Sequence, residues 1–223
     1  LGNLKFAKQN KIDQSFFSKK FYNQFRKRTV FTAVSTHPTE EIIIARMHQL
    51  LKSNIPNLIT IIIPRHIERI NEIKNQLETL KLSVAIKSIN KIINTDTDIL
   101  LVDSYGETKK FFPITNLVFM GGSLIEHGGQ NPIEPATFNL NILHGPHVKN
   151  FKEVYRLFGI KKISFKVKKV SDLVKKSKIL LNKKRSKKMN IDKLGEKTLN
   201  LAFFEIKKII NHHENKKTKI LGQ

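Results

Sequence analysis

The sequence has no cysteine among its 223 residues, which excludes disulfide bonds and thiolate metal sites and favours a reducing compartment. It also lacks any apolar run long enough to span a membrane, because the longest, residues 58–63, has only the length of a strand. No signal-peptide pattern is present, and the first residue is Leu1 rather than methionine. We therefore expect this sequence to be a piece of a longer protein.

Acidic residues are scarce: 41 Lys and Arg stand against 18 Asp and Glu, a formal net charge of +23. A field of this sign attracts nucleic acid, anionic lipid surfaces or phosphorylated substrates. The lysines are scattered along the whole chain, however, and are dense only in its last third. No aromatic residues alternate with them, as they do in proteins that stack bases. The composition therefore does not favour a dedicated nucleic-acid-binding protein.

Apolar runs of strand length alternate with helical patterns from residue 30 onward. Strands are expected at 30–34, 58–63, 84–86, 99–102, 117–120 and 141–144. Helices are expected at 38–51, 68–80, 106–112 and 199–210, and after Pro132 and Pro146. This order with short connections predicts an α/β fold, a Rossmann-like doubly wound parallel sheet. We expect a linker or arm at 1–28, the sheet domain at 29–200, and a C-terminal helix and polar tail at 201–223.

A glycine-rich connection, residues 121–136, follows the predicted strand at 117–120. It holds four glycines and two prolines and leads into a helix that begins near Pro132. Small residues let a ligand approach the backbone, and free amides together with the helix dipole attract negative charge. The motif therefore predicts a site for an anion or a ribose.

Polar residues follow five of the predicted strands. The carboxyl ends of parallel strands lie at one edge of the sheet, where ligands bind. We therefore expect these residues to converge. They are Ser35, Thr36 and His37; Pro64, Arg65 and His66; residues 103–107; Gly121, Gly122 and Ser123; and residues 145–147.

Three charged side chains at this edge are candidate ligand contacts, and each has a structural alternative. Arg65 suits a phosphate because a guanidinium binds two oxygens at once, but it could instead pair with Glu68. Glu134 suits two ribose hydroxyls, or it complements the dipole of its own helix. Glu107 is either an acid at a helix N-terminus or a ligand contact.

The histidines at 37, 66, 127, 144 and 147 lack the fixed spacing of a zinc site, so we expect no metal. His37 and His147 can instead donate hydrogen bonds to a carboxylate or phosphate, or serve as capping or core residues. Ser35 and Thr36 have no recognisable base partner, so acyl transfer is not supported.

These motifs resemble the C-terminal half of the 3-deoxy-D-manno-octulosonic acid (Kdo) transferases of lipopolysaccharide biosynthesis. The resemblance runs in matching order and spacing from about residue 2 to about residue 199. The motifs that carry it are Ser35-Thr-His37 with Glu40-Glu41, Pro64-Arg-His66, Tyr105-Gly-Glu107, Gly121-Gly-Ser123, Gly128-Gly129, Asn131-Pro-Ile-Glu-Pro135 and Gly145-Pro-His147.

The resemblance implies the C-terminal domain of a GT-B glycosyltransferase that binds CMP-Kdo as its donor and needs no metal or other cofactor. It implies transfer of Kdo to the lipid A precursor (lipid IVA) at the cytoplasmic face of the bacterial inner membrane, an anionic surface. The implied CMP contacts are Pro64, Arg65, Tyr105, Gly106, Glu107, Asn131, Pro132, Ile133 and Glu134. Further candidate donor contacts are Ser35, His37, Gly121, Gly122, Ser123 and His147.

Three departures from the family pattern qualify these expectations. The family's N-terminal domain, with its membrane anchor, acceptor groove and glutamate general base, has no counterpart in this sequence. Gln130 stands where a histidine is usual and Thr39 where a glycine is usual. We therefore expect no catalytic base in this chain and no transfer by it alone, with the acceptor domain supplied in the same or a separate chain.

Two alternatives stay open. One is another GT-B nucleotide-sugar transferase or epimerase, which base preference would distinguish. The other is a basic polyanion-binding protein, whose affinity would fall steeply with salt and would not depend on Arg65 or Glu134.

Overall fold

In the part of the chain that the structure describes, the centre is a seven-stranded, wholly parallel sheet in the order β3-β4-β2-β1-β5-β6-β7. The computed structural model describes residues 17–90 and 92–182. The strands are β1 (Thr29–Thr36), β2 (Leu58–Pro64), β3 (Val84–Ile86), β4 (Ile99–Leu101), β5 (Leu117–Met120), β6 (Asn141–His144) and β7 (Ser164–Lys166). The predicted Rossmann-like α/β fold is confirmed.

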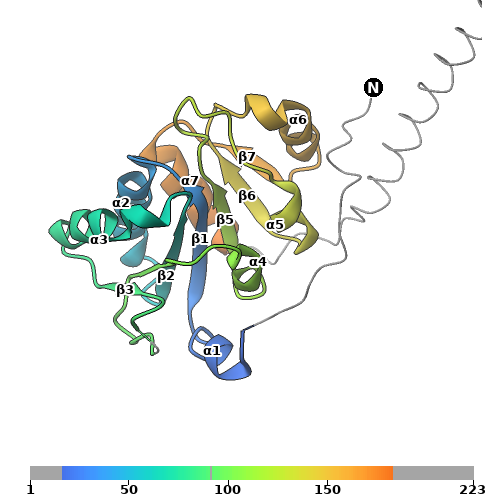
Figure 1. Cartoon of the computed structure of the whole chain (residues 1–223). Coiled ribbons are helices and arrows are strands. Elements are labelled where there is room, and N and C mark those ends of the chain that lie inside the picture. The colour runs from blue at the N-terminus through green and yellow to red at the C-terminus, as the bar shows by residue number, and fades with distance from the viewer. Residues whose placement is uncertain (1–16, 91, 183–223) are drawn as a thin grey trace, which may run out of the picture. The chain divides into compact units, whose positions relative to one another are not determined.

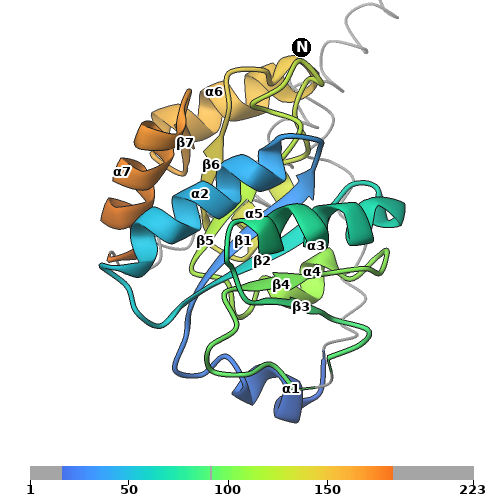
Figure 2. The same cartoon turned by 90° about the vertical axis from the view of Figure 1, so that its left-hand side faces the viewer.

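Helices cover both faces of this sheet. The α-helices are α1 (Lys19–Asn23), α2 (Glu40–Lys52), α3 (Ile70–Thr79), α4 (Thr108–Phe111), α5 (Ile133–Thr137), α6 (Lys152–Ile160) and α7 (Val170–Leu181). Two 3-10 turns, η2 (Ile67–Arg69) and η3 (Lys149–Phe151), precede α3 and α6. Helices α2, α3 and α7 lie together on one face, and α4 and α5 lie on the other (Figures 1 and 2).

The core lies where these layers meet the central strands. Every residue of β2 is buried, as expected for a strand covered on both faces. Ile44 and Met47 of α2 are fully buried, and so is Phe119 of β5. The spacing of the apolar residues in α2 orients this helix on the sheet. The N-terminus of α2 then lies at the carboxyl end of β1.

Residues 17–28 lie in the segment predicted to be a linker or arm. The ring of Phe21 lies 6.0 Å from that of Phe111 in α4, and the Tyr22 hydroxyl donates to the Lys110 carbonyl at 2.9 Å. Phe25 is buried. This part of the segment therefore packs against the domain; residues 1–16 and the predicted helix at 199–210 lie outside the described residues.

The strand order reverses between β1 and β5: β2, β4 and β3 extend the sheet on one side of β1, and β5 to β7 extend it on the other. The carboxyl ends of β1 and β5 are therefore the topological switch point. Here Ser35 has a φ of 52° and interrupts the register between β1 and β2. Its carbonyl faces Gly121, where an added Cβ would lie only 2.3 Å from the Ser35 oxygen. The close approach of the two strand ends therefore requires glycine at 121.

Replacing Gly121 with alanine should destabilise the fold by about 1–3 kcal/mol, because backbone rather than a movable side chain blocks the methyl group. Gly159→Ala is the matched control: Gly159 lies in α6 with nothing within 4 Å of its Cβ position. That change should stabilise the chain by up to about 1 kcal/mol through helix propensity. Urea unfolding of both variants measures the difference, and equal effects would contradict the steric account.

Candidate functional site

The carboxyl ends of the strands bring most of the predicted polar clusters to one edge of the sheet. Because all strand pairs are parallel, the segments that follow β1, β2, β4, β5 and β6 leave the sheet on the same side. The predicted convergence at this edge is confirmed. The individual side chains, however, fall into three neighbourhoods along it.

The first neighbourhood is organised by the carboxylate of Glu40, in the first turn of α2. Glu40 is fully buried, and its oxygens accept the backbone N–H groups of four residues. These donors are His37 (3.0 Å), Gly122 (2.7 Å), Ser123 (3.1 Å) and Leu124 (3.0 Å). One acid thus joins the end of β1, the start of α2 and the glycine-rich connection.

This network corrects one expectation from the sequence. The amides of the glycine turn were expected to be free for a ligand, but Gly122 and Ser123 donate to Glu40, and Gly121 donates to the Val34 carbonyl at 2.8 Å. The anion that the turn binds is therefore the protein's own carboxylate. Glu40 was not among the predicted donor contacts, because its sequence position carries no sign of the distant donors.

His37 lies beside this network and has an unsatisfied ring nitrogen. Its ring is 3.9 Å from the His127 ring and 5.9 Å from the His66 ring, centroid to centroid. It is 4% exposed, and its Nε2 has no hydrogen-bond partner among the described residues. Burial, reinforced by His127 and His66, lowers the pKa of His37 to about 4, so the ring is neutral near pH 7. A neutral imidazole whose Nε2 has no partner can donate or accept a hydrogen bond with a ligand here, depending on its tautomer.

Thr39 stands at the position where the family usually has glycine. Its φ is 79°, a conformation that β-branched residues rarely adopt and glycine adopts freely. The position usually held by glycine therefore keeps the glycine conformation in this chain.

The second neighbourhood lies around Arg65 and Glu68, after β2. Arg65 is exposed, and no acidic side chain in the described residues forms an ion pair with it. Glu68 instead pairs with His66 at 3.6 Å and accepts the Tyr105 hydroxyl at 3.1 Å. The alternative of an Arg65–Glu68 pair is therefore wrong, and the guanidinium is available to an anion.

Glu107 also belongs to this neighbourhood, through the β4–α4 connection. Its carboxylate lies 2.7 Å from Lys87 Nζ and 3.4 Å from Lys110 Nζ, and accepts the Ser104 hydroxyl. Burial opposes ionisation, but the hydrogen bonds from Lys87 and Ser104 outweigh it and hold the pKa of Glu107 below its ordinary value. Gly106, with a φ of 77°, makes the turn that places Glu107 there.

The segment around α5 faces α4. Glu134 Oε1 lies 3.2 Å from Lys109 Nζ, and its side chain is 43% exposed. The Asn131 side-chain oxygen accepts the Ile133 N–H at 3.0 Å, fixing the turn before α5, and Pro132 and Ile133 are buried. Glu134 is therefore exposed enough to contact a ligand. Lys109, which lies beside it, was not predicted from the sequence as a site residue.

The third neighbourhood lies at the end of β6. The His147 N–H donates to the Ser123 carbonyl at 2.9 Å, and the Gly145 N–H donates to Ser123 Oγ at 2.7 Å. His147 lines a cavity of about 490 Å³ together with Glu126, Lys149 and other residues. Neither Glu126 nor the lysines of this cavity were predicted from the sequence, because scattered lysines give no positional signal.

Two negative findings apply to the described part of the chain. No group of three or more His, Asp or Glu side chains there is arranged to hold a metal ion. No helix in residues 17–90 or 92–182 is both long and apolar enough to cross a bilayer.

The fold of this domain is also found in proteins of known structure. No protein-family model matches the chain. α,α-Trehalose 6-phosphate synthase from Burkholderia multivorans aligns with 82% of this chain and 41% of its own at a TM-score of 0.54 and 13% identity, which shows the fold alone. The domain has the Rossmann-like fold of GT-B glycosyltransferases.

The chain is also similar to proteins of one particular transferase family. The C-terminal CMP-Kdo binding domain of WaaA from Acinetobacter baumannii aligns at a TM-score of 0.68 and 26% identity, over 82% of this chain and 96% of that domain. The 3-deoxy-D-manno-octulosonic acid transferase of Haemophilus influenzae is 38% identical over 130 residues, 58% of this chain and 30% of the relative. The resemblance to the C-terminal half of the Kdo transferases is therefore confirmed, and the chain matches about a third of the length of its curated relatives.

Replacing Glu40 with glutamine should destabilise the domain by about 3 kcal/mol or more, because the amide nitrogen would face buried N–H donors and the charge that they stabilise would be lost. Glu72→Gln, on the exposed surface of α3, should cost less than about 1 kcal/mol. Denaturant unfolding measures both. Similar losses in the two variants would show that the Glu40 network is not a major constraint.

Stability should fall as the pH is lowered from 6.5 towards 4. Burial lowers the pKa of both His37 and His144 to about 4, whereas in the unfolded chain both titrate near 6.5. The unfolded state therefore binds more protons in this window, and each group removes up to about 1.4 kcal/mol per pH unit. Denaturant unfolding between pH 7.5 and 4.5 measures the slope, which His144→Phe should reduce. An unchanged slope in His144→Phe would contradict this assignment.

Proposed function

We propose that this chain is the donor-binding half of a Kdo transferase, which binds CMP-Kdo for transfer of Kdo to a lipid A precursor. The observation that carries the proposal is the match to a CMP-Kdo binding domain over 96% of that domain's length. The arrangement of the strand ends supports it, since an unpaired arginine and a half-exposed glutamate lie at the edge where such sheets bind nucleotides.

In this proposal Arg65 binds the phosphate of CMP, and Glu134 accepts hydroxyls of the ribose. Residues 105–107 and 131–133 complete the nucleotide contacts. As the bond to CMP breaks, negative charge grows on the departing phosphate, and the fixed positive charge of Arg65 stabilises it without a metal ion. Because Glu40 already occupies the turn amides, Arg65 has the larger share of this task.

The acceptor and the general base would come from an N-terminal domain, in the same or a separate chain, so this half alone should not transfer Kdo. We place the reaction at the cytoplasmic face of the inner membrane. The net charge of +23 favours association with an anionic lipid acceptor and with the membrane surface that contains it.

Calorimetric titration tests the donor site. The wild-type chain should bind CMP more tightly than UMP, and Glu134→Ala and Arg65→Ala should each weaken CMP binding about tenfold or more through loss of a charged hydrogen bond. Glu78→Ala is the matched control, since within residues 17–90 and 92–182 Glu78 pairs only with Lys74, at 2.6 Å on the exposed face of α3.

The outcomes separate this proposal from its two alternatives. Stronger binding of UMP or a guanine nucleotide would indicate another GT-B transferase or epimerase. Failure of a folded chain to bind any nucleotide, together with salt-dependent binding to polyanions, would indicate the basic interaction protein.

A further inference from the structure

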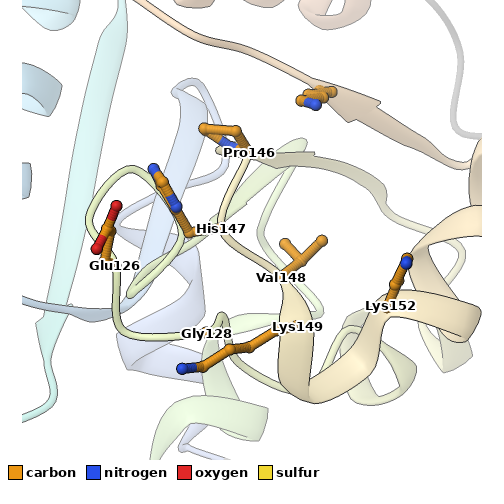
Figure 3. Close-up of a pocket in the computed structure, with 8 residues that line it drawn as sticks. Glu126, Gly128, Pro146, His147, Val148, Lys149 and Lys152 are labelled. Carbon is orange, nitrogen blue, oxygen red and sulfur yellow. The ribbon is translucent and has the colours of Figure 1, made fainter.

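A cavity of about 490 Å³ opens beside the site, at the carboxyl ends of β5, β6 and β7 (Figure 3). Three segments line it: Glu126 and Gly128 of the glycine-rich connection, residues 146–149 after β6 with Lys152 at the start of α6, and Lys166 at the end of β7. Of the residues predicted to contact the donor, only His147 reaches it. The cavity is therefore a neighbour of the nucleotide positions rather than part of them.

The walls of this cavity are held by hydrogen bonds within the protein. The Asn150 N–H donates to the Gly128 carbonyl at 3.0 Å, and the Gly129 N–H donates to the Gly122 carbonyl at 2.7 Å. A Cβ at Gly128 would lie 2.6 Å from the side-chain amide nitrogen of Asn150, so the Asn150 side chain packs directly against Gly128. A cavity bounded in this way is formed before a ligand arrives, which limits the entropy lost on binding.

The charges around the cavity are predominantly positive. Lys149, Lys152 and Lys166 line it, and none of them forms an ion pair with an acid within residues 17–90 or 92–182. The single acid in the lining is Glu126. Figure 3 shows Glu126 and His147 together on one side of the cavity and Lys152 on the other. Unpaired lysines around the cavity, together with the hydrogen-bonding groups of His147 and Glu126, suit a ligand that has both an anionic group and hydroxyls.

The size of the cavity narrows the class of ligand. A volume of this size falls within the range of small-molecule sites, about 300–1,000 Å³, and exceeds what a lone inorganic anion needs. Pro146 and Val148 add an apolar surface between the polar groups. Such a lining can contact the carbon face of a sugar ring while the polar groups bind its substituents.

We propose that this cavity binds an anionic sugar unit, with Lys149 and Lys152 on its carboxylate or phosphate and with His147 and Glu126 on its hydroxyls. The inference rests on the proposed function, because that function supplies two molecules that contain such a sugar unit. One source is the sugar acid of the donor, and the other is a phosphorylated sugar of the acceptor. Both present the same chemistry to the lysines.

NMR titration, which detects millimolar affinities, tests this assignment with free Kdo, glucosamine 1-phosphate and neutral glucose as probes. The test variant is the double substitution Lys149→Met and Lys152→Met. The control is Lys20→Met and Lys27→Met, which removes two exposed lysines near α1. Thermal unfolding of both variants shows that each is folded, and CMP is titrated in parallel.

The wild type should bind at least one anionic sugar more tightly than glucose. The test variant should weaken that binding about tenfold, and both variants should keep the CMP affinity of the wild type. Selective loss of Kdo binding identifies the donor as the source, and selective loss of glucosamine 1-phosphate binding identifies the acceptor. If neither anion binds better than glucose, or if both variants lose affinity equally, the assignment is overturned. Lysine-dependent sugar binding without CMP binding would instead refute only the proposed function.

Discussion

The carboxylate of Glu40 is the constraint on which the arrangement of the site depends. It is fully buried and accepts N–H groups from the end of β1 and from three successive residues after β5. Those two strands are the point at which the sheet changes direction, where a ligand usually binds. In this chain a side chain of the protein occupies that position. A buried charge is tolerated there because the helix N-terminus and four donors compensate for its lost hydration.

This arrangement displaces ligand binding to either side of the switch point. On one side lie Arg65, the β4–α4 connection and Glu134, which we assign to the nucleotide. On the other lies the lysine-lined cavity at the end of β6. His37, buried and neutral with a free ring nitrogen, lies near the centre. A nucleotide sugar is long enough to extend along such an edge, so this geometry suits a donor better than it suits a small anion.

The sequence predicted the parts of this structure that follow from local patterns. Strong apolar runs such as residues 58–63 determined the strands and hence the edge at which the polar residues meet. β7 and α7 were not predicted, because lysines interrupt their apolar residues and β7 has only three residues. The role of Glu40 was missed because three of its four donors lie more than 80 residues away in the sequence. The lysine cavity was missed because its lining combines three segments that only the folded sheet brings together.

A nitrogen-15-labelled sample titrated with CMP tests the central claim most directly, with UMP as the comparison. We predict that the largest amide shifts on adding CMP occur at Arg65, residues 105–107 and residues 131–134, excluding the proline. The amides of Gly122, Ser123 and Leu124 should shift less, because Glu40 keeps them bound. Equal responses to UMP, or shifts centred on the Glu40 amides with none near Glu134, would contradict the account.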